Sequence, residues 1–391
     1  MSEIKVNSIK GVGATTAAIT VNNTDGTCSA NLSNRQSNNL VINGDMRIAE
    51  RGTSSTASGY GTVDRWQVAY ANVDEAITQS QVDVASGTTP YSLGFRKALK
   101  ATNGNQTSGA DANDFVFMFQ KIEAQDIATS GWNYTNTNSF VTLSFWVKSS
   151  VAQNYFGYLK SEDPTQQSYA FETGALTADT WTKITKTIAG NSNLHFANDN
   201  ETGLVLLISP FTGTTYTDGS VNLNQWQAYV SGTRMPNHTT TWWTTNDSTF
   251  EITGVQLEVS DHATSFQFRT PSQELSLCQR YFYLLAKQVG SAGADETSLL
   301  NMAQYTSSQA YGNVHFPCSM RTAPDLIQTS GTNFFRGFAD ATQNSFNTFT
   351  LIKANTNCAE IRADGHSASG GEAIFVRTNA NTASVAFSAE L

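Results

Sequence analysis

The chain has 391 residues, enough for two or three domains with a substantial core in each. Charged residues are only 14% of the chain and aromatics reach 11%, and with abundant Thr, Ser, Asn and Gln this composition is typical of an all-β protein. The net charge is −9 and no Lys/Arg cluster occurs, which argues against a nucleic-acid partner, because phosphate backbones require a basic footprint.

The first segment, residues 1–38, is small and polar. Its few apolar residues alternate around Ile4–Ile9 and Ala17–Val21. Some forty such residues cannot bury a core alone. They are either disordered or paired with copies of themselves or with a larger particle. The opening residues carry no basic and apolar secretory pattern, so we expect synthesis in the cytosol, and no run of apolar residues is long enough to predict membrane insertion.

Residues 39–48, continuing to 62–66, are predicted to form the first strand region of a β-domain, and residues 250–258 its last strand. Between them, Val141, Leu143, Phe145 and Val147 alternate with polar residues and Trp146, which predicts a strand with one buried face. Residues 115–119 are apolar on both faces and predict a central strand. Residues 181–188 predict an exposed strand. This domain extends over 39–271.

The chain changes character near residue 271. Pro271 and a Ser272 cap precede Glu274, which predicts one short helix. A second β-domain, 272–391, is predicted from strands near residues 281–285, 311–317, 373–376 and 385–391.

The sequence lacks the usual catalytic motifs, so no enzyme activity is expected. The four cysteines fit no metal spacing and are predicted to be free thiols, the histidines form no HExxH pattern, and no Gly-x-Ser-x-Gly elbow occurs. Paired carboxylates could serve a glycosidase only if they faced each other across a cleft, which sequence does not show.

Calcium is the one cofactor that the sequence suggests. Oxygen-rich loops at Asp111 with Asp114, and at Asp199 with Glu201, supply the hard ligands that calcium prefers. The alternative is that these side chains form Asx turns.

Aromatic residues are the candidates for binding. Trp242 and Trp243 are adjacent, and on a strand they would point to opposite faces, so one could meet a ligand while the other fills the core. Trp146 lies opposite the apolar face of its strand, and His238 could supply hydrogen bonds beside the Trp pair. The alternative is that these residues belong to the core or to a trimer interface.

Several motifs carry a resemblance to a known family. The run GVQLE at 254–258, followed by 265–269 and 278–282, resembles the junction between jelly roll and carboxy-terminal domain in tail fibres of tailed bacteriophages. Residues 315–324 and 387–391 are similar to features of that family's second domain, and residues 1–7 resemble the amino termini by which marine phage fibres attach to the particle. The jelly roll is also shared with many carbohydrate-binding modules.

The resemblance implies a homotrimeric fibre on the virion tail, assembled in the host cytoplasm. Residues 1–38 would attach to other tail proteins, 39–271 would form the antiparallel jelly-roll sandwich, and 272–391 a smaller, distal, receptor-facing β-sandwich. The implied function is adsorption to a bacterial surface receptor, either a glycan or a protein. Two alternatives stay open: a structural virion decoration, and a polysaccharide-degrading tailspike, against which the lack of a long solenoid repeat counts.

Overall fold

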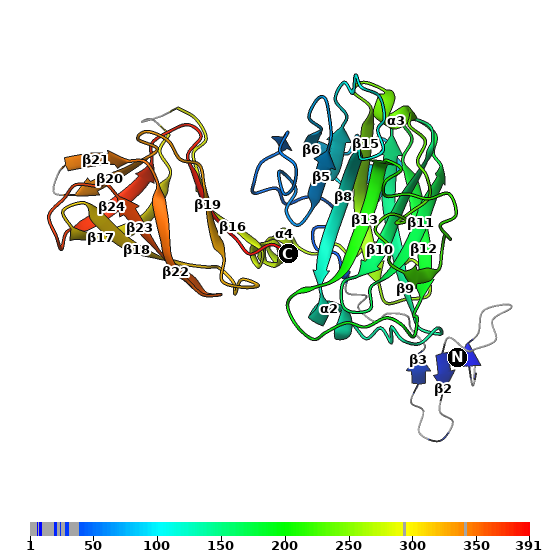
Figure 1. The fold of residues 1–391 in the computed structure, drawn as a ribbon. Helices are drawn as coiled ribbons and strands as arrows, with labels where there is room; N and C mark the ends of the chain where they lie inside the picture. Colours follow the sequence, from blue (N-terminus) through cyan, green and yellow to red (C-terminus); the bar gives the residue numbers. More distant parts are fainter. Residues whose placement is uncertain are drawn as a thin grey trace.

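The computed structural model describes residues 6, 8–9, 19–21, 24, 28–30, 39–291, 295–339 and 342–391. Every pairing between named strands in this part of the chain is antiparallel, which confirms the all-β prediction (Figure 1). The helices described are single short turns, except for α4, which spans nine residues.

Two six-stranded sheets pack face to face in the first sandwich. One has the strand order β14 (Trp226–Ala228), β11 (Gln167–Ala175), β10 (Asn154–Ser161), β13 (Thr202–Thr212), β8 (Phe115–Glu123) and β5 (Gln67–Ala71). The other has the order β12 (Thr182–Ala189), β9 (Phe140–Ser149), β15 (Thr249–Glu258), β7 (Lys97–Thr102), β6 (Thr78–Asp83) and β4 (Ser54–Ser55). Three short helices lie between strands: α1 (Thr89–Ser92), α2 (Ala124–Ala128) and α3 (Thr241–Thr244).

The core between the sheets follows the predicted alternation. Along β9, the four apolar residues at 141, 143, 145 and 147 are fully buried, whereas Trp146 lies on the opposite face and is only half-buried. β8 lies between β13 and β5, with Val116 and Met118 in the main core and Phe117 packed on the other face near Met235. β12 is an edge strand. These three predictions are confirmed.

The predicted first strand at 39–48 is wrong, and so is its continuation at 62–66. Residues 39–48 form irregular turns, with Asn43 and Met46 at positive φ, and the first longer strand, β5, begins at Gln67. The segment nevertheless lies beside β15, because Leu40 N donates to Leu257 O at 2.9 Å and Val255 N donates to Gly44 O at 2.9 Å. Gly44 permits this approach, since a Cβ there would lie 2.1 Å from Val255 O.

The second sandwich has its own core and two sheets. The smaller sheet has the order β16 (Phe282–Lys287), β25 (Ser384–Ser388) and β19 (Asp325–Gln328). The larger has the order β21 (Thr342–Phe346), β20 (Phe335–Ala339), β24 (Ala373–Thr378), β17 (Ser298–Thr306), β18 (Gln309–His315), β23 (Cys358–Asp364) and β22 (Phe349–Ala354). Strands therefore occur at each of the four predicted places, although the domain limits stay predictions.

Helix α4 (Pro271–Gln279) joins the two sandwiches. Its cap is Thr270, not the predicted Ser272: the Thr270 hydroxyl accepts from Gln273 N, and the Gln273 side chain accepts from Thr270 N. Pro271 occupies the first turn, where the missing N–H costs nothing. The capping box therefore places the helix start two residues earlier than the sequence pattern indicated.

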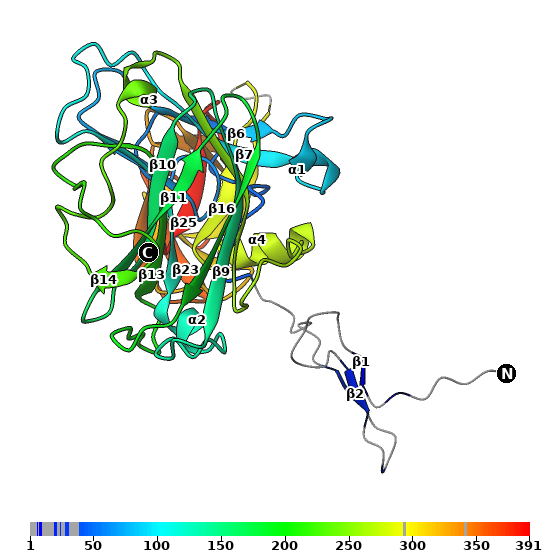
Figure 2. The same ribbon diagram turned by 90° about the vertical axis from the view of Figure 1, so that its right-hand side faces the viewer.

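Little of the predicted attachment segment 1–38 falls within the described residues. Those that are described include a three-stranded sheet of β1 (Ser8–Ile9), β2 (Ile19–Val21) and β3 (Cys28–Ala30), which stands apart from both sandwiches in Figure 2. The attachment role itself lies outside the described residues, as does the Cys28 side chain. Cys278, Cys318 and Cys358 are free thiols, as predicted. Within the described part, no helix is long and apolar enough to cross a membrane.

A candidate binding groove on the sandwich

A groove of about 490 Å³ opens on the outer face of the sheet that contains β9, β12 and β15. It brings together residues from five separate stretches of the chain. Its lining consists of Leu93, Phe95, Ser144, Trp146, Lys183, Gly254, Ala263, Thr264, Ser265, Phe266 and Phe268. Trp146 is the predicted site residue that lines this groove.

The floor of the groove is built by strand alternation. Trp146 faces outward because Phe145 and Val147, its neighbours in β9, fill the core. Its cross-strand partners are Lys183 in β12 and Thr253 in β15. Side chains on such directly opposed residues lie about 5 Å apart at Cβ, so the indole and the ammonium stem are neighbours.

Three phenylalanine rings form one wall. The ring centroids of Phe95 and Phe266 are 5.0 Å apart, those of Phe95 and Phe268 5.2 Å, and those of Phe266 and Phe268 4.9 Å. Phe95 is 2% exposed and anchors the group, whereas Phe268 is 42% exposed. Gly254, at φ 63°, lets the Phe95 ring approach the sheet, since a Cβ there would lie 2.6 Å from the ring. The wall therefore presents fixed apolar surface to the groove.

Residues 259–270, which we call the strap, carry Phe266 and Phe268 and are fixed from below by two buried side chains of β15. Glu258 accepts from Thr264 N at 2.9 Å and from Thr264 Oγ1 at 2.7 Å. Gln256 accepts from Gln267 N at 2.8 Å and donates to Glu258 at 2.9 Å. Hydrogen bonds to a buried carboxylate are strong, so the strap is held firmly over the sheet.

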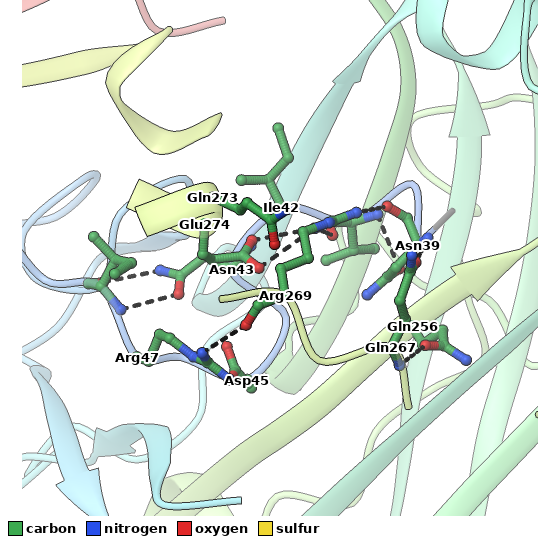
Figure 3. Close-up of polar contacts among 12 residues, drawn as sticks. Asn39, Ile42, Asn43, Asp45, Arg47, Gln256, Gln267, Arg269, Gln273 and Glu274 are labelled. Carbon is green, nitrogen blue, oxygen red and sulfur yellow. Dashed lines mark hydrogen bonds and ion pairs between the residues drawn. The ribbon is translucent and has the colours of Figure 1, made fainter. Parts of the chain in front are cut away.

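The far end of the strap is tied to the segment that begins the sandwich, as Figure 3 shows. Asn39 N donates to Gln267 Oε1 at 2.6 Å, and Arg269 donates to the Asn39 carbonyl. Arg269 also pairs with Glu274 of α4 at 3.2 Å, while Arg47 donates to Arg269 O at 2.9 Å. Contacts across more than 220 residues of sequence thereby set the position of the phenylalanine wall.

The rest of the lining includes polar side chains. Ser144, Thr264 and Ser265 supply hydroxyl groups, and Lys183 is the only charged residue among those that line the groove. The groove therefore combines apolar rings with hydrogen-bonding groups, which suits a ligand that has both kinds of surface.

The adjacent tryptophans Trp242 and Trp243 do not reach a binding surface, so the prediction that one of them faces outward is wrong. They lie in helix α3, not on a strand, and are 0% and 1% exposed. Trp242 Nε1 donates to Thr249 O at 3.1 Å, and Trp243 Nε1 donates to Gly109 O at 2.6 Å. A helical turn lets both indoles enter the core, as the alternative interpretation of the pair proposed.

His238 is also separate from the groove. Its ring packs on the other sheet, with its centroid 5.1 Å from that of Phe156 and 6.1 Å from that of Phe211, and Nε2 lies 3.2 Å from Met235 Sδ. Burial lowers its pKa to about 3, so the ring is neutral at physiological pH. The predicted pairing of His238 with an exposed tryptophan is not observed.

The calcium candidates lie in two turns. Asp199 accepts from Glu201 N at 3.1 Å, which is the Asx turn of the alternative interpretation. Asp114 accepts instead from the backbone N of Asp111, three residues earlier, at 2.6 Å. Glu201 also pairs with Arg321 at 3.5 Å. Among the described residues, no group of three or more His, Cys, Asp or Glu side chains is arranged to hold a metal ion. Calcium binding at these loops stays a prediction.

Sequence reasoning missed the phenylalanine wall and Lys183. The available signal was the pair Phe266 and Phe268, two large apolar residues just beyond the predicted last strand, in a stretch with no strand pattern to bury them. Lys183 gave no signal by itself, because its importance comes from its register with Trp146.

No model of a known protein family and no curated protein matches the sequence. Similar solved structures include the enzymatically active domain of tailspike protein 4 of Bacteriophage CBA120, with 9% identity, a TM-score of 0.30 and coverage of 57% of this chain but only 21% of that one. A sugar binding protein from Bacteroides thetaiotaomicron matches with 12% identity, a TM-score of 0.30 and coverage of 57% and 100%. The CBM22-1 xylan-binding domain from Paenibacillus barcinonensis matches with 10% identity, a TM-score of 0.27 and coverage of 58% and 97%. The functional assignment therefore rests on the groove itself.

Proposed function

We propose that this protein binds saccharides in the Trp146 groove, without chemical conversion of the ligand. The observation that carries the proposal is that one groove holds both aromatic rings, those of Trp146 and Phe268, and polar side chains, among them Ser144 and Lys183. A pyranose ring also has both kinds of surface, because its C–H groups form an apolar face and its hydroxyl groups lie at the edge. Aromatic rings contact the apolar face, and hydrogen-bonding side chains contact the hydroxyl groups.

The resemblance of the sequence to phage tail fibres gives this binding a biological setting. We propose a virion protein that adsorbs the particle to a bacterial surface glycan, with residues 1–38 attached to the tail and three copies per fibre. Single grooves of this size bind weakly, and several tethered copies raise the overall affinity without any new contact. We therefore propose a receptor contact on the first sandwich, in contrast to the distal position that the resemblance implied.

Binding to cells tests this proposal. Fluorescently labelled full-length protein should bind saturably to at least one strain in a panel of bacteria, and mild periodate oxidation of the cell-surface sugars should abolish that binding. Protease treatment of the same cells should leave it unchanged. Binding to no strain, or binding that survives periodate and is lost after protease treatment, would contradict a glycan receptor.

A further inference from the structure

We propose that the groove selects acidic saccharides, with Lys183 receiving the carboxylate of a uronic-acid residue whose ring lies against Trp146. This inference rests on the proposed saccharide binding and goes beyond it by naming the class of ligand. It is carried by the register of β12 against β9, which sets the Lys183 cation beside the half-buried indole of Trp146.

Lys183 is exposed and, like Lys100 and Lys186, lacks a carboxylate partner among the described residues, whereas three other lysines of this sandwich are paired. Lys97 pairs with Asp83 at 2.6 Å, Lys148 with Glu251 at 3.1 Å, and Lys160 with Glu162 at 2.9 Å. The ammonium group at the groove is therefore available to an anionic ligand. A charge-assisted hydrogen bond to a carboxylate is about twice as strong as one between neutral groups.

The next row of side chains on the same outer face of the sheet contains two more lysines. Glu251 of β15 stands between Lys100 of β7 and Lys148 of β9, so two cations there share one carboxylate. Lys148 also lies 5.2 Å from the centroid of the Trp181 ring. At the other end of the groove, the buried Glu258 carboxylate is occupied by Thr264 and Gln256. Lys183 is thus the charged side chain that lines the groove, in a chain that carries a net charge of −9.

A different role for Lys183 is to protect an edge strand, because lysines on edge strands discourage pairing with other chains. Such a lysine would have no influence on the charge preference of a ligand in the groove. A comparison of acidic and neutral forms of one polymer therefore separates the two roles.

The probes are polygalacturonate, alginate and hyaluronate, each compared with its own carboxyl-reduced form, which keeps the sugar linkages and removes the charge. We expect the full-length protein to bind at least one acidic polymer two- to fivefold more tightly than its reduced form, in line with about 0.2–1 kcal/mol for an exposed ion pair. Lys183→Gln should remove this preference, because the acidic polymer loses its ion pair and the reduced polymer has none to lose, so the affinity for the acidic polymer should fall more. Lys353→Gln, an exposed lysine of the second sandwich, is the matched control and should keep the preference.

The outcomes separate this inference from the proposed function. Equal binding of both forms by the wild type, or an unchanged preference in a folded Lys183→Gln variant, would overturn the acidic selectivity and leave saccharide binding in place. Binding to none of the six polymers would overturn both. Preferential binding that weakens between about 50 and 500 mM NaCl and disappears in Lys183→Gln would support the inference.

Discussion

Arg65 and Glu390, 325 residues apart in the sequence, form an ion pair that ties the last residues of the chain to the first sandwich. Arg65 is 1% exposed, its guanidinium lies 3.4 Å from the centroid of the Tyr281 ring, and it donates to Lys121 O at 2.7 Å. Arg51 also pairs with Glu390, at 3.0 Å. In Figure 1 the end of the chain lies beside α4, between the two sandwiches.

This junction predicts a large effect for Glu390→Gln. The substitution leaves the buried Arg65 guanidinium without its counter-charge, and breaking a buried pair costs about 3–5 kcal/mol. Urea unfolding of the full chain, followed by tryptophan fluorescence, should show a lower midpoint. Glu201→Gln is the control, since its carboxylate is 75% exposed and its removal should change the midpoint little. Equal midpoints for the two variants would contradict the assigned role of Glu390.

The same junction predicts that stability falls as pH rises from about 6.5 to 8. Burial and the nearby Asp64 carboxylate raise the pKa of Glu50 to about 7, and burial raises the pKa of Asp64 to about 6. Both pKa values exceed those of the same groups in the unfolded chain, so the folded state binds more protons. The resulting contribution to the free energy of unfolding is lost as pH rises through the folded-state pKa. His238, with its lowered pKa, has the opposite effect, which is half gone at pH 6.5, its unfolded value, and fades above it, so it reduces but does not reverse the fall. Unfolding midpoints at pH 6.5 and 8 measure the slope.

Glu50→Gln is the matched variant for this pH dependence. It removes the group that titrates within the window, so the midpoint should change less between pH 6.5 and 8 than in the wild type. A wild-type midpoint that rises with pH over this interval, or the same fall in both proteins, would contradict the assignment to Glu50.

The tryptophans should separate into structural and binding residues. Trp243→Ala removes a fully buried indole and should cost about 3–5 kcal/mol of unfolding free energy, because a cavity remains and Gly109 O loses its donor. Trp146→Ala removes a half-buried indole and should cost distinctly less. Thermal unfolding of both variants provides the comparison. A larger loss of stability in Trp146→Ala would place Trp146 in the core.

The strap should become more dynamic when one of its hydrogen bonds to the buried Glu258 carboxylate is removed. Thr264→Val removes the 2.7 Å hydrogen bond from Thr264 Oγ1 to Glu258 and leaves a buried carboxylate oxygen without that donor. Amide hydrogen exchange across residues 259–270 should become faster, with the rest of the sandwich unchanged. Thr185→Val, on the exposed side of β12, is the control and should leave strap exchange unaltered. Unchanged exchange in Thr264→Val would mean that Gln256 and Asn39 hold the strap without this contact.

Sequence patterns predicted the strands in which one periodicity dominates, such as β9 with its buried 141, 143, 145 and 147 positions. They failed where side chains bond to backbone groups. Residues 39–48 look like a strand, but the Asn39 side chain accepts from Val41 N and the Asn43 side chain donates to Ile48 O, and these local bonds stabilise turns. The groove was predictable only through Trp146, because Lys183, Gly254 and the strap reach it through long-range pairing that no local pattern encodes.

The affinity of Trp146→Ala for the acidic polymers tests the central claim most directly. Phe375→Ala, which removes an aromatic ring that is 60% exposed on the second sandwich, is the matched control. If saccharides bind in the groove, Trp146→Ala should bind about two- to tenfold more weakly than the wild type, in line with about 0.5–1.5 kcal/mol for an aromatic contact, while Phe375→Ala binds normally. Equal affinity of wild type and a folded Trp146→Ala variant, or a loss confined to Phe375→Ala, would show that the ligand binds elsewhere.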